Sequence, residues 1–226
     1  MCVIRLNIHT KLWIEFDLIT TRLIMLSIIK SLDMNKLFYR IFLFYTIISC
    51  KSETKKLTDI DGNQYSIAKY GETFWMTENL KVRRDINGND INYFFPDNDS
   101  GNVQLYGLLY DFETACKVCP QGWRLPNNAD WEQLFNFSKD NVAGNYKDKQ
   151  FWEGEINSNN SGFSIRPSGI GNNKEHPNNF GENTLFWSDS KEEEHFIWTY
   201  ILEKGKTKIR KASQHPTYAF SIRCIK

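Results

Sequence analysis

The rest of the chain is organised around Cys119-Pro120-Gln121-Gly122-Trp123-Arg124-Leu125-Pro126 and the residues that follow it, 127–134. It combines a cysteine, two prolines, a turn glycine and two tryptophans. Proline and glycine restrict where a helix can continue, so this stretch separates two helical segments. Bulky aromatic side chains beside such a restricted backbone indicate a structural junction. The stretch therefore predicts how the domain is built more clearly than what it binds.

Helices are expected on both sides of this junction. Apolar residues at a spacing close to the helical period predict one helix over residues 106–118, which Pro120 and Gly122 end. On the other side, Asn127 is a helix N-cap with Asp130 three residues later, a variant of the capping box. This second helix runs to about residue 140, and one of its faces consists of Trp131, Leu134 and Phe135.

The segments outside the helices have the pattern of antiparallel strands. Residues 57–69 predict a hairpin around the turn triplet Asp61-Gly62-Asn63, and a third strand follows at Phe74-Trp75-Met76. Further strands are expected at residues 163–166, 185–188, 196–202, 207–210 and 218–225, the last with Phe220, Ile222 and Cys224 on one face. Two early helices and mostly late antiparallel strands define an α+β fold.

A long polar connection, residues 81–102, is rich in Asp, Asn and Gly. Alternating carboxylate and amide oxygens suit calcium, but the later bidentate Glu of a helix-loop-helix calcium site is missing. Asx-turns account for the same residues without a metal. We favour the turn interpretation.

Composition and charge limit the classes of function. The chain has 226 residues, of which 41% are hydrophobic and 15% aromatic, which is sufficient for a folded core. The formal net charge is +1, but residues 51–226 contain 22 basic and 24 acidic residues of interspersed sign. Because this part of the chain has no basic field, nucleic acid is not expected as a partner.

Residues 34–50 have the organisation of an export signal. Lys36 and Arg40 provide a basic start, residues 41–48 are apolar, and Ser49 is a small residue for cleavage before Cys50. The end of this segment resembles the lipobox of bacterial lipoproteins, in which the cysteine is lipidated and becomes the mature N-terminus. A transmembrane anchor is the alternative, but the apolar run falls well below the ~20 residues of a spanning helix.

Residues 1–33 fit poorly in front of such a signal, because charged residues interrupt their apolar segments. We hypothesise that Met34 is the true start and that residues 1–33 are a mis-assigned extension. A peptide from residues 1–33 in mass spectra of the native precursor would contradict this. Residues 51–56 then form a short polar tether between the lipid and the domain.

Several separate motifs occur in one order along residues 57–226: residues 59–63, 75–80, 106–110, 119–126, Trp131, 161–163, 187–188 and 220–224. In these motifs the chain resembles the Fibrobacter succinogenes major paralogous domain, common in surface lipoproteins of Bacteroidetes and Fibrobacteres. The resemblance implies a C-type lectin-like fold, with two helices packed on antiparallel sheets and a long loop region. It also implies a lipid-anchored protein at the outer membrane or cell surface of a Gram-negative bacterium. It implies no particular activity.

An exported protein meets an oxidising compartment, where disulfides persist. With Cys2 and Cys50 set aside, the resemblance to lectin-like folds implies a bridge between Cys119 and Cys224, which leaves Cys116 free on the apolar face of its helix. The alternative is a redox pair of Cys116 and Cys119. A reactive pair requires a helix N-terminus, where the dipole stabilises thiolate, whereas this pair follows a helix C-terminus.

The loop of residues 175–189 contains one constellation of oxygen ligands. It resembles the long loop of sugar-binding C-type lectins, which supplies oxygens to calcium and to sugar hydroxyls. His176 and Ser188 depart from that pattern, and an Asn/Gly-rich surface loop beside a buried Trp187 is the favoured alternative. Lack of calcium binding heat or of thermal stabilisation at millimolar calcium would contradict the calcium hypothesis. That hypothesis names as ligands Glu175, Asn178, Glu182, Asn183 and Asp189.

The sequence contains no recognised catalytic motif. None of the four histidines has a second His or Cys at zinc-ligand spacing, and no nucleophile elbow, phosphate loop or dinucleotide fingerprint occurs. We therefore expect a surface-anchored, non-catalytic binding module, with glycan or cell-wall polysaccharide as its ligand. Trp152, in a polar stretch, is the candidate for an exposed sugar-stacking platform.

Two other functions stay open. The first is a protein–protein adhesion or structural module of the cell envelope, which predicts a large exposed apolar patch. The second is an enzyme of the formylglycine-generating type, whose fold is related. That chemistry requires two reactive cysteines late in the domain, where only Cys224 lies.

Overall fold

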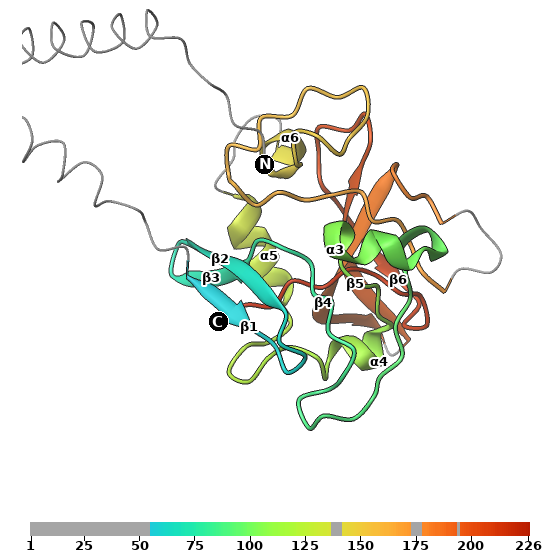
Figure 1. Ribbon diagram of the computed structural model, residues 1–226. Coiled ribbons are helices and arrows are strands. Elements are labelled where there is room, and N and C mark those ends of the chain that lie inside the picture. Colours follow the sequence, from blue (N-terminus) through green and yellow to red (C-terminus); the bar gives the residue numbers. More distant parts are fainter. Residues whose placement is uncertain (1–54, 137–141, 173–177, 194) are drawn as a thin grey trace, which may run out of the picture. The chain divides into compact units, whose positions relative to one another are not determined.

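A computed structural model describes residues 55–136, 142–172, 178–193 and 195–226 (Figure 1). Residues 54–226 form one compact unit. The expected extension (1–33), the signal peptide (34–50) and most of the tether (51–56) lie outside the described residues. In the part of the chain that is described, no helix is long and apolar enough to cross a membrane.

The first sheet has three antiparallel strands in the order β1 (Lys56–Thr58), β2 (Gln64–Tyr70) and β3 (Thr73–Met76). Asp59 fixes the turn between β1 and β2, because its carboxylate accepts the backbone N–H groups of Asp61 and Asn63, both at 2.9 Å. Gly62 adopts the positive φ of 82° that this turn needs. The hairpin and the third strand expected from the sequence are confirmed.

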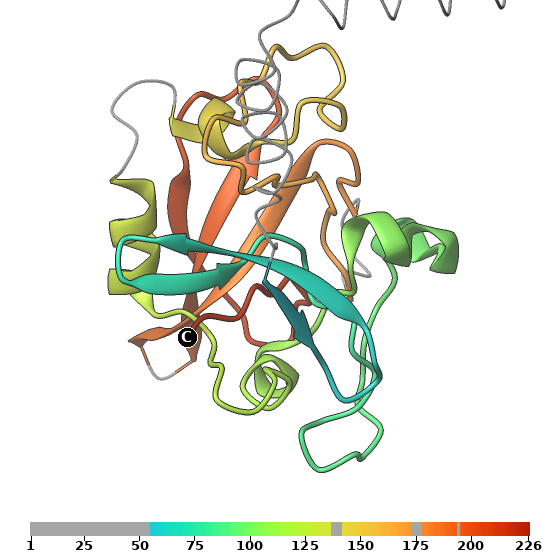
Figure 2. The ribbon, with the colours of Figure 1, turned by 60° about the vertical axis from the view of Figure 1, so that its left-hand side comes forward.

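The second sheet is also antiparallel, in the order β4 (Asn183–Glu193), β5 (Phe196–Glu203) and β6 (Arg210–Gln214). Residues 184–188 of β4 are all buried, so both faces of the strand are covered and its apolar run is nearly continuous. Figure 2 shows the orange to red strands of this sheet crossing the direction of the blue to green strands of the first. The strands expected at residues 185–188 and 196–202 are confirmed. The second strand of the hairpin is Arg210–Gln214 and not residues 207–210, and residues 163–166 form only an isolated bridge at Ile165.

The polar connection of residues 81–102 contains Asx-turns, as favoured from the sequence. Asp85 accepts the backbone N–H groups of Asn87 and Asn89 at 2.8 and 2.9 Å. Asp59 makes the same pair of bonds in the first hairpin, and the two turns have the related sequences Asp-Ile-Asp-Gly-Asn and Asp-Ile-Asn-Gly-Asn. A repeated turn of five residues therefore occurs at residues 59–63 and 85–89.

The helical segments are short: η1 (Pro96–Asn98), η2 (Ser100–Asn102), α3 (Val103–Tyr106), α4 (Phe112–Ala115), α5 (Asn128–Phe135) and α6 (Val142–Tyr146). The single helix predicted over residues 106–118 is wrong. Gly107, with φ 78°, ends α3, and the following residues 108–110 are extended and fully buried. Leu109 bridges to Phe94, and Tyr110 bridges to Phe220. The apolar run that suggested a helix is therefore a strand-like core segment.

The second predicted helix is α5, and its N-terminus forms as expected. The side chain of Asn127 accepts from the backbone N–H of Asp130 at 3.0 Å, and the Asp130 carboxylate accepts from the backbone N–H of Asn127 at 2.7 Å. These two bonds complete a capping box. The helix ends at Phe135, earlier than residue 140.

We expect the substitution Asn127→Ala to lower the free energy of unfolding by about 1 kcal/mol, because the first turn of α5 loses its acceptor. Urea unfolding measures this change. Gln133→Ala, at an exposed position of the same helix, is the matched control and should change stability by less than ~0.5 kcal/mol. Equal effects of the two substitutions would contradict the capping role.

Residues 219–225 connect the two sheets without forming a regular strand. Their bridges join Ala219 to Gly171, Phe220 to Tyr110, Ser221 to Phe186, and Ile225 to both Trp75 and Arg124. All seven side chains are buried. The sequence predicted that only one face of this segment, with Phe220, Ile222 and Cys224, would be buried. Ser221 and Arg223 on the opposite face are buried as well.

A disulfide between Cys119 and Cys224, with a Cα–Cα distance of 5.7 Å, ties the junction after α4 to this C-terminal segment. The pairing implied by the family resemblance is confirmed, and the redox pair of Cys116 and Cys119 is excluded. Cys116 is a free thiol, as expected, but it is exposed and not on a buried helix face. Partial shielding of its sulfur raises the pKa of Cys116 to about 11, so the thiol is a weak nucleophile at neutral pH.

Trp131 of α5 is the centre of an aromatic core. Its ring lies 4.8 Å from that of Trp75, 5.3 Å from Phe186 and 5.6 Å from Tyr200, measured between centroids. The indole N–H donates to the backbone carbonyl of Trp187 at 3.2 Å. The junction thus anchors α5 in the core, as the sequence suggested.

Trp152 also lies in the core. The expectation of an exposed sugar platform is wrong, because this side chain is only 2% exposed. Its indole N–H donates to the carbonyl of Ile165 at 2.8 Å, and its ring lies 4.4 Å from the ammonium of Lys147. Lys147 is itself buried and pairs with Glu155 at 2.7 Å. Among the polar residues near Trp152 in the sequence, Lys147 and Glu155 therefore form an ion pair whose cation is buried.

The Glu155 carboxylate gives stability that depends on pH. Burial alone would raise its pKa, but the bonds from Lys147, the Gly205 backbone and Asn157 outweigh burial and hold the pKa below its ordinary value of 4.5. A depressed pKa in the folded state stabilises the fold above pH 4.5, and this contribution is lost as the pH falls through the folded pKa.

We expect the substitution Glu155→Gln to remove that part of the acid-induced loss of stability and to cost about 1–3 kcal/mol at pH 7. Thermal unfolding between pH 3 and pH 7 measures both effects, with Glu153→Gln, almost fully exposed, as the matched control. The same pH profile in both variants would show that Glu155 contributes nothing to it.

Candidate functional site

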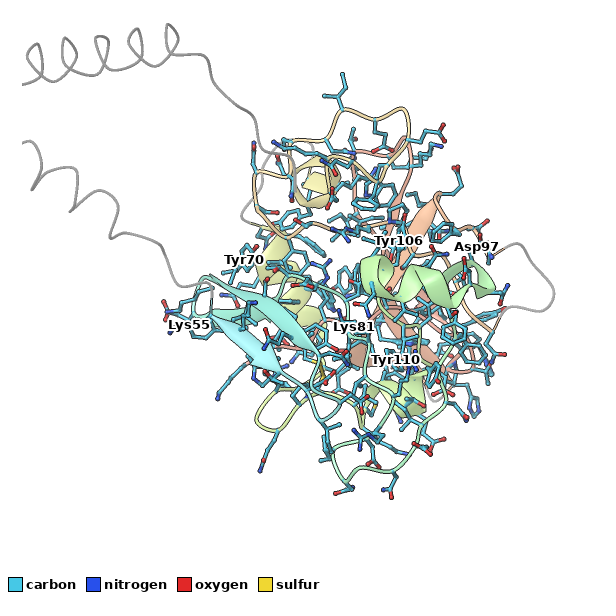
Figure 3. The ribbon with its side chains drawn as sticks, in the orientation of Figure 1. Lys55, Tyr70, Lys81, Asp97, Tyr106 and Tyr110 are labelled. Carbon is cyan, nitrogen blue, oxygen red and sulfur yellow. A yellow bond between two sulfur atoms is a disulfide. The ribbon has the colours of Figure 1, made fainter. Side chains whose placement is uncertain are left out.

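A polar pocket is the candidate site. Its volume is about 250 Å³, and it lies where residues of β2, the segment after β3 and α3 meet the C-terminal segment. Figure 3 shows Lys81, one of its residues, between the first sheet and α3. The pocket is lined by Ser66, Thr77, Glu78, Asn79, Lys81, Gln104, Leu105, Gly107, Ser164, Arg166 and Arg223. Leu105 is the one large apolar side chain in this set, so a ligand meets mostly hydrogen-bonding groups.

Arg223 forms the inner wall of the pocket and is only 2% exposed. Its Nε donates to the side-chain oxygen of Asn79 at 2.8 Å, and its Nη2 donates to the carbonyl of Ser164 at 3.0 Å. Nη1 donates to the carbonyl of Phe163, whose ring centroid lies 4.4 Å from the guanidinium carbon. Burial lowers the pKa of Arg223 to about 9, so the group is still charged at neutral pH.

A chain of buried hydrogen bonds runs inward from the pocket. The amide nitrogen of Asn79 donates to the Ser221 hydroxyl at 3.2 Å. The Ser168 hydroxyl bonds to that of Ser221 at 2.8 Å and to that of Thr184 at 2.7 Å. Because each of these groups has partners, the inner wall is held in one arrangement before any ligand arrives.

The rim of the pocket contains two further cations. Arg166 is paired with Asp148 at 3.2 Å and donates to the carbonyl of Leu105 at 2.7 Å. Lys81 donates to the side-chain oxygen of Gln104 at 3.1 Å, and it forms no ion pair with any described carboxylate. Arg166 is therefore neutralised by its neighbour, and Lys81 is not.

The structure does not bring the predicted calcium ligands together. Glu175 lies outside the described residues. The amide nitrogen of Asn178 donates to Asp97 at 2.8 Å, and Glu182 pairs with Lys204 at 3.0 Å. No group of three or more His, Cys, Asp or Glu side chains suited to a metal occurs among the residues that the structure describes.

Asn183 and Asp189 cannot share one calcium ion. Both belong to β4, and a strand advances by roughly 3.3 Å per residue, so about 20 Å separates them. Two ligands of one calcium ion lie within about 5 Å of each other, since each is 2.3–2.6 Å from the metal. The five residues therefore do not form a single site, and calcium binding by the remaining three stays a prediction.

Sequence reasoning missed the residues that line the pocket. Asn79 and Arg223 were recognised only as parts of motifs, in Thr77-Glu78-Asn79-Leu80 and Ser221-Ile222-Arg223-Cys224. The available signal was an arginine flanked by Ile222 and Cys224 in an otherwise apolar segment, which indicates a buried charge. Its partner Asn79 lies 144 residues away, so no local pattern reveals the contact.

Comparison with known families finds one match, which covers well over half of the chain. Residues 68–226 match the Fibrobacter succinogenes major domain. No curated protein matches the chain significantly. No solved structure matches it either. With its mixed helices and two antiparallel sheets, the chain belongs to the Fibrobacter succinogenes major domain family.

Proposed function

We propose that this protein is a lipid-anchored module of the outer membrane or cell surface that binds a glycan or cell-wall polysaccharide without catalysis. The observation that carries the proposal is the pre-formed polar pocket around Arg223 and Asn79. Sugar hydroxyls are both donors and acceptors, and the amides, hydroxyls and cations of the pocket complement them.

Other features support the same proposal. A C-type lectin-like arrangement agrees with the short helices packed near antiparallel sheets and with a disulfide to the final segment. The sequence of residues 34–50 supports export, with Cys50 as the lipidated residue.

An array of neutral and acidic glycans, probed with the full chain, tests the binding function. We expect selective binding that the double substitution Thr77→Ala/Lys81→Gln weakens at least tenfold, because both residues line the pocket. Lys208→Gln, an exposed cation outside the pocket, is the matched control. A folded protein that binds no glycan would overturn the proposal.

Lipidation at Cys50 is tested separately by feeding expressing cells a labelled fatty acid. The wild-type chain should incorporate the label, and Cys50→Ala should not. Equal labelling of the two chains would show that Cys50 is not the lipidated residue.

A second candidate function is protein–protein adhesion or a structural role in the envelope. It is favoured by Ile60 and Ile86, which are 44% and 56% exposed in the two repeated turns. The turns are neighbours, since Arg84 donates to the carbonyl of Ile60 at 3.3 Å. If this function holds, Ile60→Ser/Ile86→Ser abolishes cell adhesion while the glycan array stays negative.

A further inference from the structure

We propose that the pocket recognises the carboxylate of an acidic sugar, a uronic acid residue, through Arg223 and Lys81. This inference rests on the proposed glycan-binding function and names its ligand class. It follows from the charges of the pocket, from its volume and from the hydrogen bonds that account for asparagine at position 79.

The first step is that Arg223 is a buried cation without an ion pair among the described residues. A guanidinium has five N–H donors, and three of those of Arg223 have protein acceptors, all of them neutral. No described carboxylate forms an ion pair with it, although the charges of Glu78 and Asp148 favour its protonated form from a distance. Burial of an unpaired cation is costly, and buried charges in proteins normally have a counter-charge. Because this group lines a pocket, a bound anion is able to supply it.

The second step is the reason that the protein does not supply the counter-charge itself. The natural place for a carboxylate is residue 79, whose side-chain oxygen accepts from Arg223. The other end of this side chain donates to the carbonyl of Tyr106 at 2.9 Å and to Ser221. Aspartate has no donor for the Tyr106 carbonyl and would leave it without this partner, which accounts for asparagine at the position.

The third step concerns the other charges of the pocket. Glu78 is the one carboxylate in the lining; it is exposed, and its Oε1 accepts from the backbone N–H of Ser66 at 2.8 Å. Arg166 is paired with Asp148. Lys81 and Arg223 are therefore the two cations of the lining that have no ion pair with a described carboxylate, and both attract a carboxylate that enters the pocket.

The last step favours a sugar over an acidic peptide. The pocket volume of about 250 Å³ is below the ~300–1,000 Å³ of sites for drug-sized ligands, so it fits one monosaccharide residue. Hydroxyls and amides of Thr77, Gln104 and Ser164 line it, which suits a polyhydroxylated ring. A peptide needs apolar surface for its neighbouring residues, and Leu105 alone offers it.

Isothermal titration of the full chain with glucuronate and galacturonate tests this inference. Both should bind at least about tenfold more tightly than their methyl esters, because esterification removes the charge but keeps the ring. The substitution Gln104→Glu adds one negative charge at an exposed position of the pocket and should weaken acid binding at least fivefold. Gln133→Glu, exposed on α5, is the matched control and should change nothing.

Arg223→Lys is the direct variant, and its folding is checked by thermal unfolding. Gln104→Glu keeps the inference testable if that variant does not fold. Equal affinity for acids and esters would overturn the inference but leave glycan binding standing. Tight binding of a glutamate-containing peptide, with no binding of uronates, would overturn it in favour of a protein ligand. Binding of no saccharide at all would overturn the proposed function as well.

Discussion

Replacement of Cys119 and Cys224 together by alanine is expected to lower the free energy of unfolding by about 4–5 kcal/mol. The disulfide closes a loop with a sequence separation of 105 residues. In the chain-entropy model, a cross-link of this span removes about 4.7 kcal/mol of conformational freedom from the unfolded chain. A loss of this size is a large fraction of the 5–15 kcal/mol that holds an ordinary domain together.

Urea unfolding of the wild type, of the double variant and of the chemically reduced wild type measures this effect. The last two should agree, since both lack the same bond. Cys116→Ala is the control, because this cysteine is free and exposed and should contribute less than ~0.5 kcal/mol. A double variant as stable as the wild type would show that the bridge does not constrain the unfolded chain.

The substitution Trp131→Ala is expected to cost about 3–5 kcal/mol, because it leaves a cavity where several aromatic rings meet. The ring is fully buried and also stacks on Phe135 at a centroid distance of 5.5 Å. Loss of the indole leaves the carbonyl of Trp187 without its donor.

Two variants separate the packing effect from a general sensitivity to tryptophan loss. Trp131→Phe keeps most of the ring volume and should cost distinctly less than the alanine variant. Trp198→Ala, at a half-buried position beside Lys211, should cost less than either cavity-forming change in the core. Thermal unfolding measures the loss of stability in the three variants. A larger loss for Trp198→Ala than for Trp131→Ala would show that Trp131 is not the centre of the core.

Local structure was the part of the fold that could be predicted from the sequence. The turn at Asp59 and the cap at Asn127 depend on side chains that bond to backbone groups two to four residues away. Such contacts join residues that are close in the sequence, so a local sequence pattern predicts them. β4 and β5 of the second sheet were equally clear, because β-branched and aromatic residues cluster in them, whereas β6 lacks such residues and was expected too early in the sequence.

Long-range burial could not be predicted in this way. Residues 108–110 have a spacing that fits a helix, but tertiary bridges to Phe94 and Phe220 make them extended. Trp152 lies among polar residues in the sequence, yet it is buried against Lys147, which pairs with the partly buried Glu155. In both cases the conformation or burial depends on contacts that the local sequence pattern does not show.

The candidate pocket shows the same limit for function. The family resemblance drew attention to the loop of residues 175–189, whose oxygen-rich residues are visible in the sequence. The pocket instead combines residues from positions 66 to 223, and none of them belongs to a local sequence motif that indicates a binding site. Only the fold shows that Arg223 is buried without an ion pair to any described carboxylate.

The course of residues 219–225 has a consequence for biosynthesis. These residues form bridges to Trp75, Tyr110, Arg124, Gly171 and Phe186, so they pair with segments that are all translated before them. The core of this domain cannot close while residues 219–225 are still inside the ribosome. The domain therefore completes its fold only after residues 219–225 have left the ribosome.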